Sequence, residues 1–308
     1  MTSTSAADPS SAMAETPNWL ELPHEIMGGM ILQRLGTVEI LNNAQKVCTT
    51  WRKICKDPAM WKVIDMRQFF DDCDTDYDIE QLAKQAVYRS CGELIDISLE
   101  YFGTDDLLDY ISHSSSKLNR LRLTNCYGVT GFGLNNALKR LPHLETLKLS
   151  YISICAEDIE VIGRNCPQLK SFKMKILFMR CDGDAHAIAN SMPTLRHLKL
   201  VGSTMDNDDG VQAILNGCPH LESLDLRGCF YLRLDGDLEK LCRERIKDFK
   251  FKRNNIPQGY GESDMESIDD EIIDDFYDGI GIDWPEDYYG FSGGSAISSE
   301  DGYDLPSP

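Results

Sequence analysis

Few residues of this sequence stand at a spacing that could support catalysis. His24-Glu25 begins like the zinc-protease motif H-E-x-x-H, but Gly28 occupies the position of the second histidine ligand. Gly131-x-Gly133 lacks the third glycine of a dinucleotide-binding loop and does not follow the strand that such a loop requires. No phosphate-binding loop and no G-x-S-x-G nucleophile elbow occurs in the sequence.

One further motif, Asp182-Gly-Asp184-x-His186, can be interpreted as a metal site or as a loop that enters a helix. The six histidines are otherwise scattered, and the eleven cysteines include no Cys-x-x-Cys pair. We therefore expect no catalytic residue, no bound metal and no cofactor.

The net charge of −19 is divided unevenly along the 308 residues. No Lys or Arg follows Arg253, and residues 254–308 hold 15 of the 50 acidic residues. The preceding part of the chain carries 35 acids against 31 bases. A strongly acidic protein is not expected to bind DNA or RNA directly, because such binding depends on cationic contacts to phosphates.

The cellular location is constrained by what the sequence lacks. No apolar stretch reaches the roughly 18 residues of a membrane-spanning helix. Residues 1–17 are rich in Ser, Thr and Ala and contain no apolar block typical of a signal peptide. The cysteine spacing fits a reducing compartment better than a secreted disulfide framework. We expect the protein in the nucleus, the cytoplasm or both, without a membrane partner.

The pattern L-x-x-L-x-L recurs through the middle of the chain. Four copies match it fully, and three looser copies carry Ile, Phe or Met at one or more positions. The first residues of the seven copies are Leu94, Leu118, Leu144, Leu169, Leu195, Leu221 and Ile246. The steps between them are 24, 26, 25, 26, 26 and 25 residues, a regularity that indicates a structural repeat.

Each repeat unit predicts a strand, a turn and a helix. The final L-x-L alternates as a strand does, so its two leucines point to the same side. The helical segments stop at prolines two residues before the next leucine: Pro142, Pro167, Pro193 and Pro219. No unit can bury its own leucines, so neighbouring units must stack into a parallel sheet with the helices outside. The fold class is therefore α/β.

These features resemble the cysteine-containing leucine-rich repeats of F-box proteins. The shared residues are Cys166-Pro167-x-Leu169 and Cys218-Pro219-x-Leu221, together with Cys126 and Cys229, which each stand eight residues after the first leucine of a repeat. The resemblance implies a solenoid whose parallel strands line a concave face. We expect these cysteines to be reduced packing residues.

Residues 18–66 carry a second set of motifs. They open with Leu22-Pro23-x-Glu25-Ile26, continue with Val47-Cys48-x-x-Trp51-Arg52 and close with Asp57-Pro58-x-x-Trp61. Apolar spacing predicts three short helices, with Thr37 as the cap of the second and Val47 inside the third. Three such helices make a small core, so part of their apolar surface should be covered by a partner.

This stretch resembles an F-box, the module that binds the Skp adaptor of SCF (Skp–cullin–F-box) ubiquitin ligases. Together with the repeats, the resemblance extends over about residues 18–253. This region is similar to plant F-box proteins of the Skp-interacting-partner type. It implies an adaptor-binding set, which is Leu22, Pro23, Ile26, Val47, Cys48 and Trp51. The alternative is that Val47 and Trp51 are core residues of an ordinary helical cap.

The expected organisation has four parts. Residues 1–17 form a disordered N-terminus, and 18–66 form a three-helix F-box with a capping strand made by Trp61, Ile64 and Met66. Residues 67–253 form about seven leucine-rich repeats, and 254–308 form an acidic disordered tail that contains aromatic residues. The tail is either a solubilising segment or a segment that docks on a cationic surface.

A cationic concave face is the main candidate binding surface. Strand positions that alternate with the leucines give 18 sites in the second to seventh copies, of which nine are Lys or Arg and two are Asp. The nine are Arg120, Arg122, Lys148, Lys173, Lys175, Lys199, Arg227, Lys250 and Lys252. Like charges on neighbouring strands are unfavourable, which favours an anion-binding role. The alternative is that exposed strand positions are simply polar.

The resemblance implies a non-catalytic substrate receptor of a ubiquitin ligase. The F-box would bind the Skp adaptor, and through it the cullin and RING subunits, while the repeats bind an unknown, acidic or phosphorylated target protein. The alternative is a leucine-rich-repeat scaffold that binds an adaptor without directing degradation. An enzyme with an unrecognised site is a more distant third reading.

Overall fold

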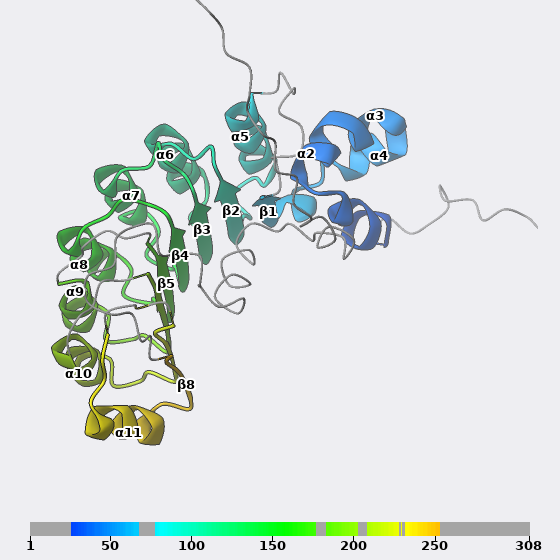
Figure 1. Ribbon diagram of the computed structural model, residues 1–308. Coiled ribbons are helices and arrows are strands. Elements are labelled where there is room, and N and C mark those ends of the chain that lie inside the picture. The colour runs from blue at the N-terminus through cyan, green and yellow to red at the C-terminus, as the bar shows by residue number, and fades with distance from the viewer. Residues whose placement is uncertain are drawn as a thin grey trace, which may run out of the picture.

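A computed structural model shows a curved solenoid with a small helical unit at its N-terminal end (Figure 1). The residues that the structure describes are 26–67, 78–176, 183–202, 208–227, 229 and 232–252. The sheet lies along the inner side of the curve and the helices lie along the outer side (Figure 1). The predicted α/β architecture, with helices outside a parallel sheet, is confirmed.

Eight parallel strands of the described chain form one sheet in which each strand pairs with the next strand in the sequence. They are β1 (Val63–Met66), β2 (Asp96–Glu100), β3 (Arg120–Thr124), β4 (Thr146–Ser150), β5 (Ser171–Lys175), β6 (His197–Val201), β7 (Ser223–Asp225) and β8 (Asp248–Lys250). Strands β2 to β8 coincide with the seven predicted leucine motifs.

Burial of the leucine pairs sets the register of this sheet. Leu121 and Leu123 of β3 are fully buried and lie opposite Leu147 and Leu149 of β4. Shifting one strand by a single residue would turn its leucines to solvent. The pairing is therefore fixed, and equivalent positions of successive repeats lie side by side.

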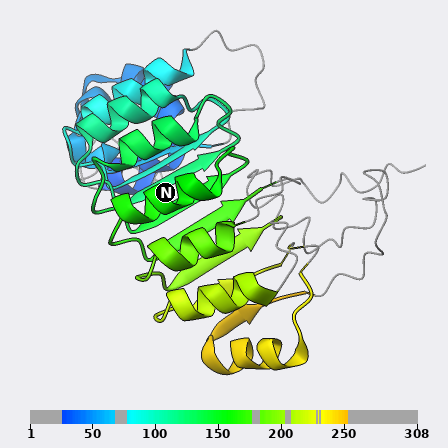
Figure 2. The same ribbon diagram turned by 90° about the vertical axis from the view of Figure 1, so that its left-hand side faces the viewer.

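The outer helices follow the strands in alternation and stack in chain order (Figure 2). They are α5 (Ile79–Arg89), α6 (Asp105–Ser114), α7 (Gly131–Leu138), α8 (Ala156–Asn165), α9 (Asp184–Ser191), α10 (Asp208–Gly217) and α11 (Gly236–Arg245). Side chains such as Thr104, Thr130 and Asp235 cap them by accepting the backbone N–H three residues later. The repeat prolines lie in the turns that follow the helices, as predicted.

The N-terminal unit consists of short helical segments. They are η2 (Met27–Ile31), η3 (Leu32–Leu35), α2 (Thr37–Glu39), η4 (Ile40–Ala44), α3 (Gln45–Val47), α4 (Thr49–Ile54) and η5 (Pro58–Trp61), where η denotes a π or 3-10 turn. Their core contains Leu32, Leu41 and Ile54, each at most 2% exposed.

Two sequence expectations for this unit are wrong. Thr37 is not a helix cap: Gly36, at φ 78°, precedes α2, and Thr37 is a buried residue of the helix itself. Val47 does not belong to the third helix, because Cys48 is extended and separates α3 from α4. The Cys48 thiol then caps α4 by accepting the Trp51 N–H at 3.4 Å.

Gly28 has low helix propensity, but the absence of a side chain at this position allows close packing. A Cβ atom at this position would lie 3.0 Å from Ile54 Cγ2 and from Met60 Sδ. The glycine therefore lets η2 approach α4 and η5 closely, which offsets part of its conformational cost.

Strand β1 joins the N-terminal unit to the solenoid as a capping strand that contains Ile64 and Met66, as predicted, whereas Trp61, which was expected in the strand, ends η5 instead. Ile64 and Met66 are fully buried, and they pair in register with Ile97 and Leu99 of β2. The N-terminal unit is thus continuous with the repeat sheet.

Arg89, the last residue of α5, reinforces this junction. Its guanidinium donates to the Cys55 carbonyl oxygen at 3.1 Å and to Gln45 Oε1 at 2.8 Å. It also lies over the buried Trp61 ring, 5.5 Å from the centroid. Trp61 Nε1 donates to the same Cys55 carbonyl at 3.0 Å. Because the guanidinium is partly removed from water in this contact, the pKa of Arg89 is lowered.

Adjacent repeats are also linked through their helix caps. Asp105 accepts the Thr130 N–H at 2.8 Å and its hydroxyl at 2.7 Å. Asp158 accepts Asn135 Nδ2 at 2.9 Å from the preceding repeat. A Cβ at Gly131 would lie 2.2 Å from Asp158 Oδ2, so this glycine is needed for the close approach of the two repeats.

The four cysteines of the repeat motif are buried packing residues, as predicted. Cys126, Cys166, Cys218 and Cys229 are at most 1% exposed, and the described cysteines are free thiols. Burial raises the pKa of Cys166 to about 12 and contributes most to raising that of Cys218 to about 11. Both thiols are therefore protonated at neutral pH and are weak nucleophiles.

Every helix in the described ranges is too short or too polar to span a lipid bilayer. The predicted disordered N-terminus 1–17 and the acidic tail 254–308 lie outside the described residues.

Replacing Gly131 by alanine should destabilise the solenoid. The added methyl group displaces the Asp158 carboxylate, and we expect the free energy of unfolding to fall by about 1–3 kcal/mol. Gly236 is a matched control, because it also begins a helix but a Cβ there meets nothing within 4 Å. Urea unfolding of Gly131→Ala and Gly236→Ala measures the difference, and equal stabilities would contradict the packing argument.

Replacing Arg89 by methionine should loosen the junction. Gln45 loses its donor and the Cys55 carbonyl keeps only the Trp61 Nε1–H, so we expect the free energy of unfolding to fall by about 1–3 kcal/mol. Amide hydrogen exchange should rise mainly in residues 45–61 and little in the central repeats. Arg164→Met is the control, because Arg164 makes only an exposed ion pair with Glu160. Uniform exchange along the chain would contradict a local role for Arg89.

Candidate functional site

The concave sheet brings four of the predicted cations together in one row. Arg122, Lys148, Lys173 and Lys199 are register partners on the consecutive strands β3 to β6. We call these four residues the cationic column. Because neighbouring strands lie about 4.8 Å apart, four side chains of the same sign are held beside one another.

A buried carboxylate limits the column at its C-terminal end. Asp225 is the next register position after Lys199 and is 6% exposed. It pairs with Lys199 at 3.3 Å and with Arg227 at 2.9 Å. Burial acts to raise the pKa of Asp225, but the Arg227 hydrogen bonds and the Lys199 charge outweigh it, so its pKa is lowered. Asp225 is therefore ionised at neutral pH.

Carboxylates also limit the column at its N-terminal end. Asp96 of β2 pairs with Arg120 at 3.3 Å, and Asp65 of β1 pairs with Arg67 at 2.6 Å. Sequence reasoning missed Asp65 and Arg67 because β1, which contains Asp65 and precedes Arg67, comes before the clear leucine motifs. The alignment of Asp65 with Ser98 and Arg122 in the sheet was available only through the capping strand.

Arg122 and Lys148 form the least compensated part of the column. Both are half-buried, and within the described residues neither forms an ion pair at 4 Å or less. Burial lowers the pKa of Lys148, and the nearby charges of Arg122 and Lys173 lower it further. The pKa of Arg122 is lowered by burial and by Arg67 as well. These two groups would gain most from a bound anion.

The remaining predicted cations lie outside this central region. Lys175 is 6% exposed, and its ammonium lies 5.3 Å from the centroid of the Tyr151 ring. Lys250 pairs with Asp248 at 3.4 Å on the last strand, and Lys252 is half-buried just beyond it. The nine predicted residues therefore do not form one uniform surface.

Tyrosines gather at the carboxyl ends of the strands, and sequence reasoning missed them. Tyr101 and Tyr151 directly follow β2 and β4, and both have positive φ, at 71° and 58°. Tyr127 follows β3 and is 77% exposed, with its hydroxyl 3.5 Å from Asn125 Oδ1. Burial raises the pKa of Tyr151, and the phenols of Tyr101 and Tyr127 add to this. Aligning the repeats at their strand ends would have revealed the cluster.

The predicted adaptor-binding residues have different environments. Ile26 and Val47 are 39% and 64% exposed, whereas Trp51 is half-buried against the core. Cys48 is half-buried and serves as the cap of α4. Leu22 and Pro23 lie outside the described residues. Leu35, at 42% exposed, is an additional apolar surface residue that the motif did not indicate.

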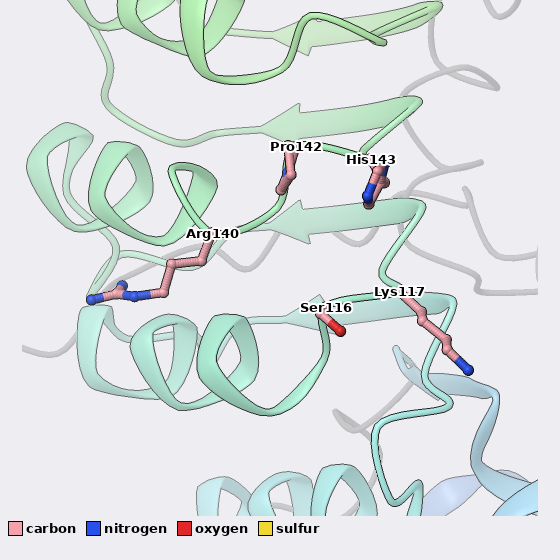
Figure 3. A pocket seen from close by; sticks show the side chains of 5 residues that line it. All are labelled: Ser116, Lys117, Arg140, Pro142 and His143. Carbon is pink, nitrogen blue, oxygen red and sulfur yellow. The ribbon is translucent and has the colours of Figure 1, made fainter.

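A hollow between two repeat turns does not qualify as a ligand site. Ser116, Lys117, Arg140, Pro142 and His143 line it (Figure 3). Its two cations point away from each other and pair elsewhere, Lys117 with Glu93 at 2.6 Å and Arg140 with Asp109 at 3.1 Å.

The motif considered as a metal site is only partly described. Asp182 lies outside the described residues, Asp184 begins α9 as a buried residue, and His186 is exposed. Among the described side chains, no group of three or more His, Cys, Asp or Glu is arranged to hold a metal ion.

Comparison with known proteins places this geometry in a family. The F-box-like family model matches residues 19–67. The chain is 46% identical over 306 residues to the F-box protein SKIP19 of Arabidopsis thaliana, covering 98% of this chain and 99% of that protein. It is 41% identical over 284 residues to the putative F-box/LRR-repeat protein 22 of the same plant, covering 87% and 91%.

A solved structure with a similar repeat is the leucine-rich repeat-containing protein LegL7 of Legionella pneumophila. It overlaps 55% of this chain and 57% of its own length, with 15% identity and a TM-score of 0.39. The assignment rests instead on the two plant relatives, which match nearly the whole chain. This chain belongs to the F-box/leucine-rich-repeat family of proteins.

Proposed function

We propose that the protein is the substrate-recognition subunit of an SCF ubiquitin ligase. Its F-box segment would bind the Skp adaptor and, through it, the cullin and RING subunits. Its repeat sheet would bind the target protein. One observation carries the proposal: an F-box-like unit with exposed apolar side chains is continuous, through β1, with a sheet that presents a cationic column.

The exposed apolar residues support adaptor binding. Ile26, Leu35 and Val47 lie in the F-box segment with 39%, 42% and 64% of their surface exposed. Isolated exposed apolar residues are ordinary, but three in a small helical unit are consistent with a covered face. Leu22 and Pro23, which the F-box motif adds to this set, remain part of the proposal.

The proposed mechanism is proximity rather than catalysis. A receptor that holds the adaptor and the target together raises the effective concentration of target lysines near the conjugating enzyme. The buried thiols of the repeats, with raised pKa values, are poorly suited to nucleophilic catalysis. The receptor would act in the nucleus, the cytoplasm or both.

The second candidate function is a non-degradative scaffold. It uses the same two binding surfaces, so geometry alone favours neither outcome for the bound target. The fate of the target after binding separates the two functions.

Replacing Val47 by asparagine should weaken adaptor binding. The substitution removes an apolar contact and places an unpaired amide in the interface, so we expect at least about a tenfold loss of affinity for a purified Skp adaptor. Val63→Asn is a matched control, because Val63 is also an exposed valine, at 54%, but lies in β1. Calorimetry or pull-down titration measures both variants.

The double variant Leu22→Ala/Pro23→Ala provides a second test that does not depend on Val47. It should also reduce co-purification with the adaptor. If the wild-type chain does not bind any Skp adaptor, or if Val47→Asn and Val63→Asn are equally affected, the proposed adaptor face is wrong.

Removing adaptor binding should stabilise the target in cells. Proteins that co-purify with the Leu22→Ala/Pro23→Ala variant should have longer half-lives when this variant replaces the wild type, because they are bound but not ubiquitinated. Half-lives are measured after translation is blocked. Unchanged half-lives for all captured proteins would favour the scaffold function instead.

A further inference from the structure

We propose that the centre of the concave sheet is a phosphate-recognition site, in which Arg122, Lys148 and Lys173 receive one phosphorylated side chain of a target protein. The inference rests on the proposed role of the sheet as the target-binding surface and names the chemical class of the target. The ligand is a single phosphorylated residue, not a long acidic segment or a nucleic acid.

Strand register supplies the geometry. Arg122, Lys148 and Lys173 are direct partners on β3, β4 and β5. At a strand spacing of about 4.8 Å, the three side chains originate within about 10 Å of one another. Lysine and arginine side chains are long enough to converge over that distance on one phosphate, and arginine can bind two phosphate oxygens at once.

The electrostatic state of these residues favours a dianion. Arg122 and Lys148 are half-buried, and burial lowers the pKa of both groups. The charges of Arg122 and Lys173 lower the pKa of Lys148 further, and that of Arg67 lowers the pKa of Arg122. A phosphoserine or phosphothreonine carries a charge of about −1.5 to −2 at neutral pH, which a carboxylate cannot match. Its binding would relieve the repulsion between at least two neighbouring strands.

Carboxylates at both ends define the size of the ligand. Asp225 closes the row after Lys199, and Asp96 and Asp65 flank it on the other side. An extended polyanion lying across the strands would pass over at least one of these acidic residues. The surface therefore suits a short, concentrated negative charge. A long polyanion would in addition be repelled by the acidic net charge of the whole chain.

Hydroxyl groups surround the central lysines. Thr146 and Ser150 lie two residues before and after Lys148 on the same face of β4, and Ser171 is the register partner of Thr146. All three are partly exposed. They are small, so they leave room above the sheet, and their hydroxyl groups can donate to phosphate oxygens.

The tyrosine cluster gives the site a direction. Tyr101, Tyr127 and Tyr151 lie at or just beyond the carboxyl ends of β2, β3 and β4, and the ammonium of Lys175, on the same strand as Lys173, lies 5.3 Å from the centroid of the Tyr151 ring. Aromatic side chains provide apolar contact area with a polar tip. The geometry therefore favours a target with an apolar residue close to the phosphorylated one, packed toward this edge.

Binding of matched peptides to the full-length chain tests the proposal. The probes are fluorescent peptides of one sequence, with leucine beside a central phosphoserine, serine or glutamate. At low salt, the phosphoserine peptide should bind at least about tenfold more tightly than either comparison peptide, and its affinity should fall as salt is raised. Fluorescence anisotropy gives the three dissociation constants.

Lys148→Met should weaken phosphopeptide binding by about tenfold, because it removes one charge-assisted hydrogen bond while keeping the aliphatic length. Lys139→Met is the matched control: it removes the same charge from an exposed lysine after the outer helix α7 and should have no effect. Thermal unfolding of both variants checks that the fold is retained.

A full-length variant with the acids of residues 262–278 changed to their amides tests competition by the tail. Tighter phosphopeptide binding by this variant would show that the tail competes for the same site and would support the proposal. If phosphoserine and glutamate peptides bind equally, if Lys148→Met and Lys139→Met behave alike, or if neither the wild type nor this variant binds the phosphopeptide, the proposal is overturned.

The same preparations separate this proposal from the ligase function. Lys148→Met should still bind the adaptor, and Val47→Asn should still bind the phosphopeptide. Adaptor binding without phosphopeptide binding would remove only the phosphate site. Phosphopeptide binding without adaptor binding would remove only the ligase role.

Discussion

The structure depends on in-register burial of two apolar side chains from each of the strands β1 to β6. Because the residues between and beside them must then point away from the helices, every repeat places its polar strand positions in the same rows. The cationic column is a direct result of this constraint. Four cations of like sign become neighbours because the leucines behind them, not the cations themselves, determine the strand pairing. The stability of the core thus maintains an arrangement of charge that is unfavourable on its own.

The N-terminal unit depends on the same sheet through β1 and Arg89. A single guanidinium contacts the Cys55 carbonyl, Gln45 and the Trp61 ring, which come from three successive parts of the F-box segment. Since Arg89 belongs to the first outer helix, these contacts couple the orientation of the F-box to the first repeat. The concave repeat surface can therefore differ in its side chains without altering this connection to the F-box segment.

The repeat, the sheet and the capping strand could be predicted from the sequence, because the regular spacing of apolar residues reflects their burial and does not depend on the contacts of individual side chains. The helix boundaries of the F-box unit were less predictable, since Cys48 adopts an extended conformation that no propensity indicates. Compensation of the cations was not predictable either. Whether Asp225 pairs with Lys199 and Arg227 depends on side-chain directions across two strands, and Asp65 enters only through a strand outside the repeat pattern. The same limit applies to Gly131, whose role requires the position of Asp158 in the next repeat.

The sequential order of the strands also determines the distance between the cationic column and the F-box segment. Lys148 lies three strand steps from β1, so about 14 Å of sheet separates the middle of the column from the F-box connection. Inserting or removing one repeat between them would translate the column by about 4.8 Å and rotate it by roughly 20°, because neighbouring strands twist. The number of repeats on the N-terminal side therefore determines the position and the angle of the column relative to the F-box segment. Repeats on the C-terminal side can change in number without altering that distance.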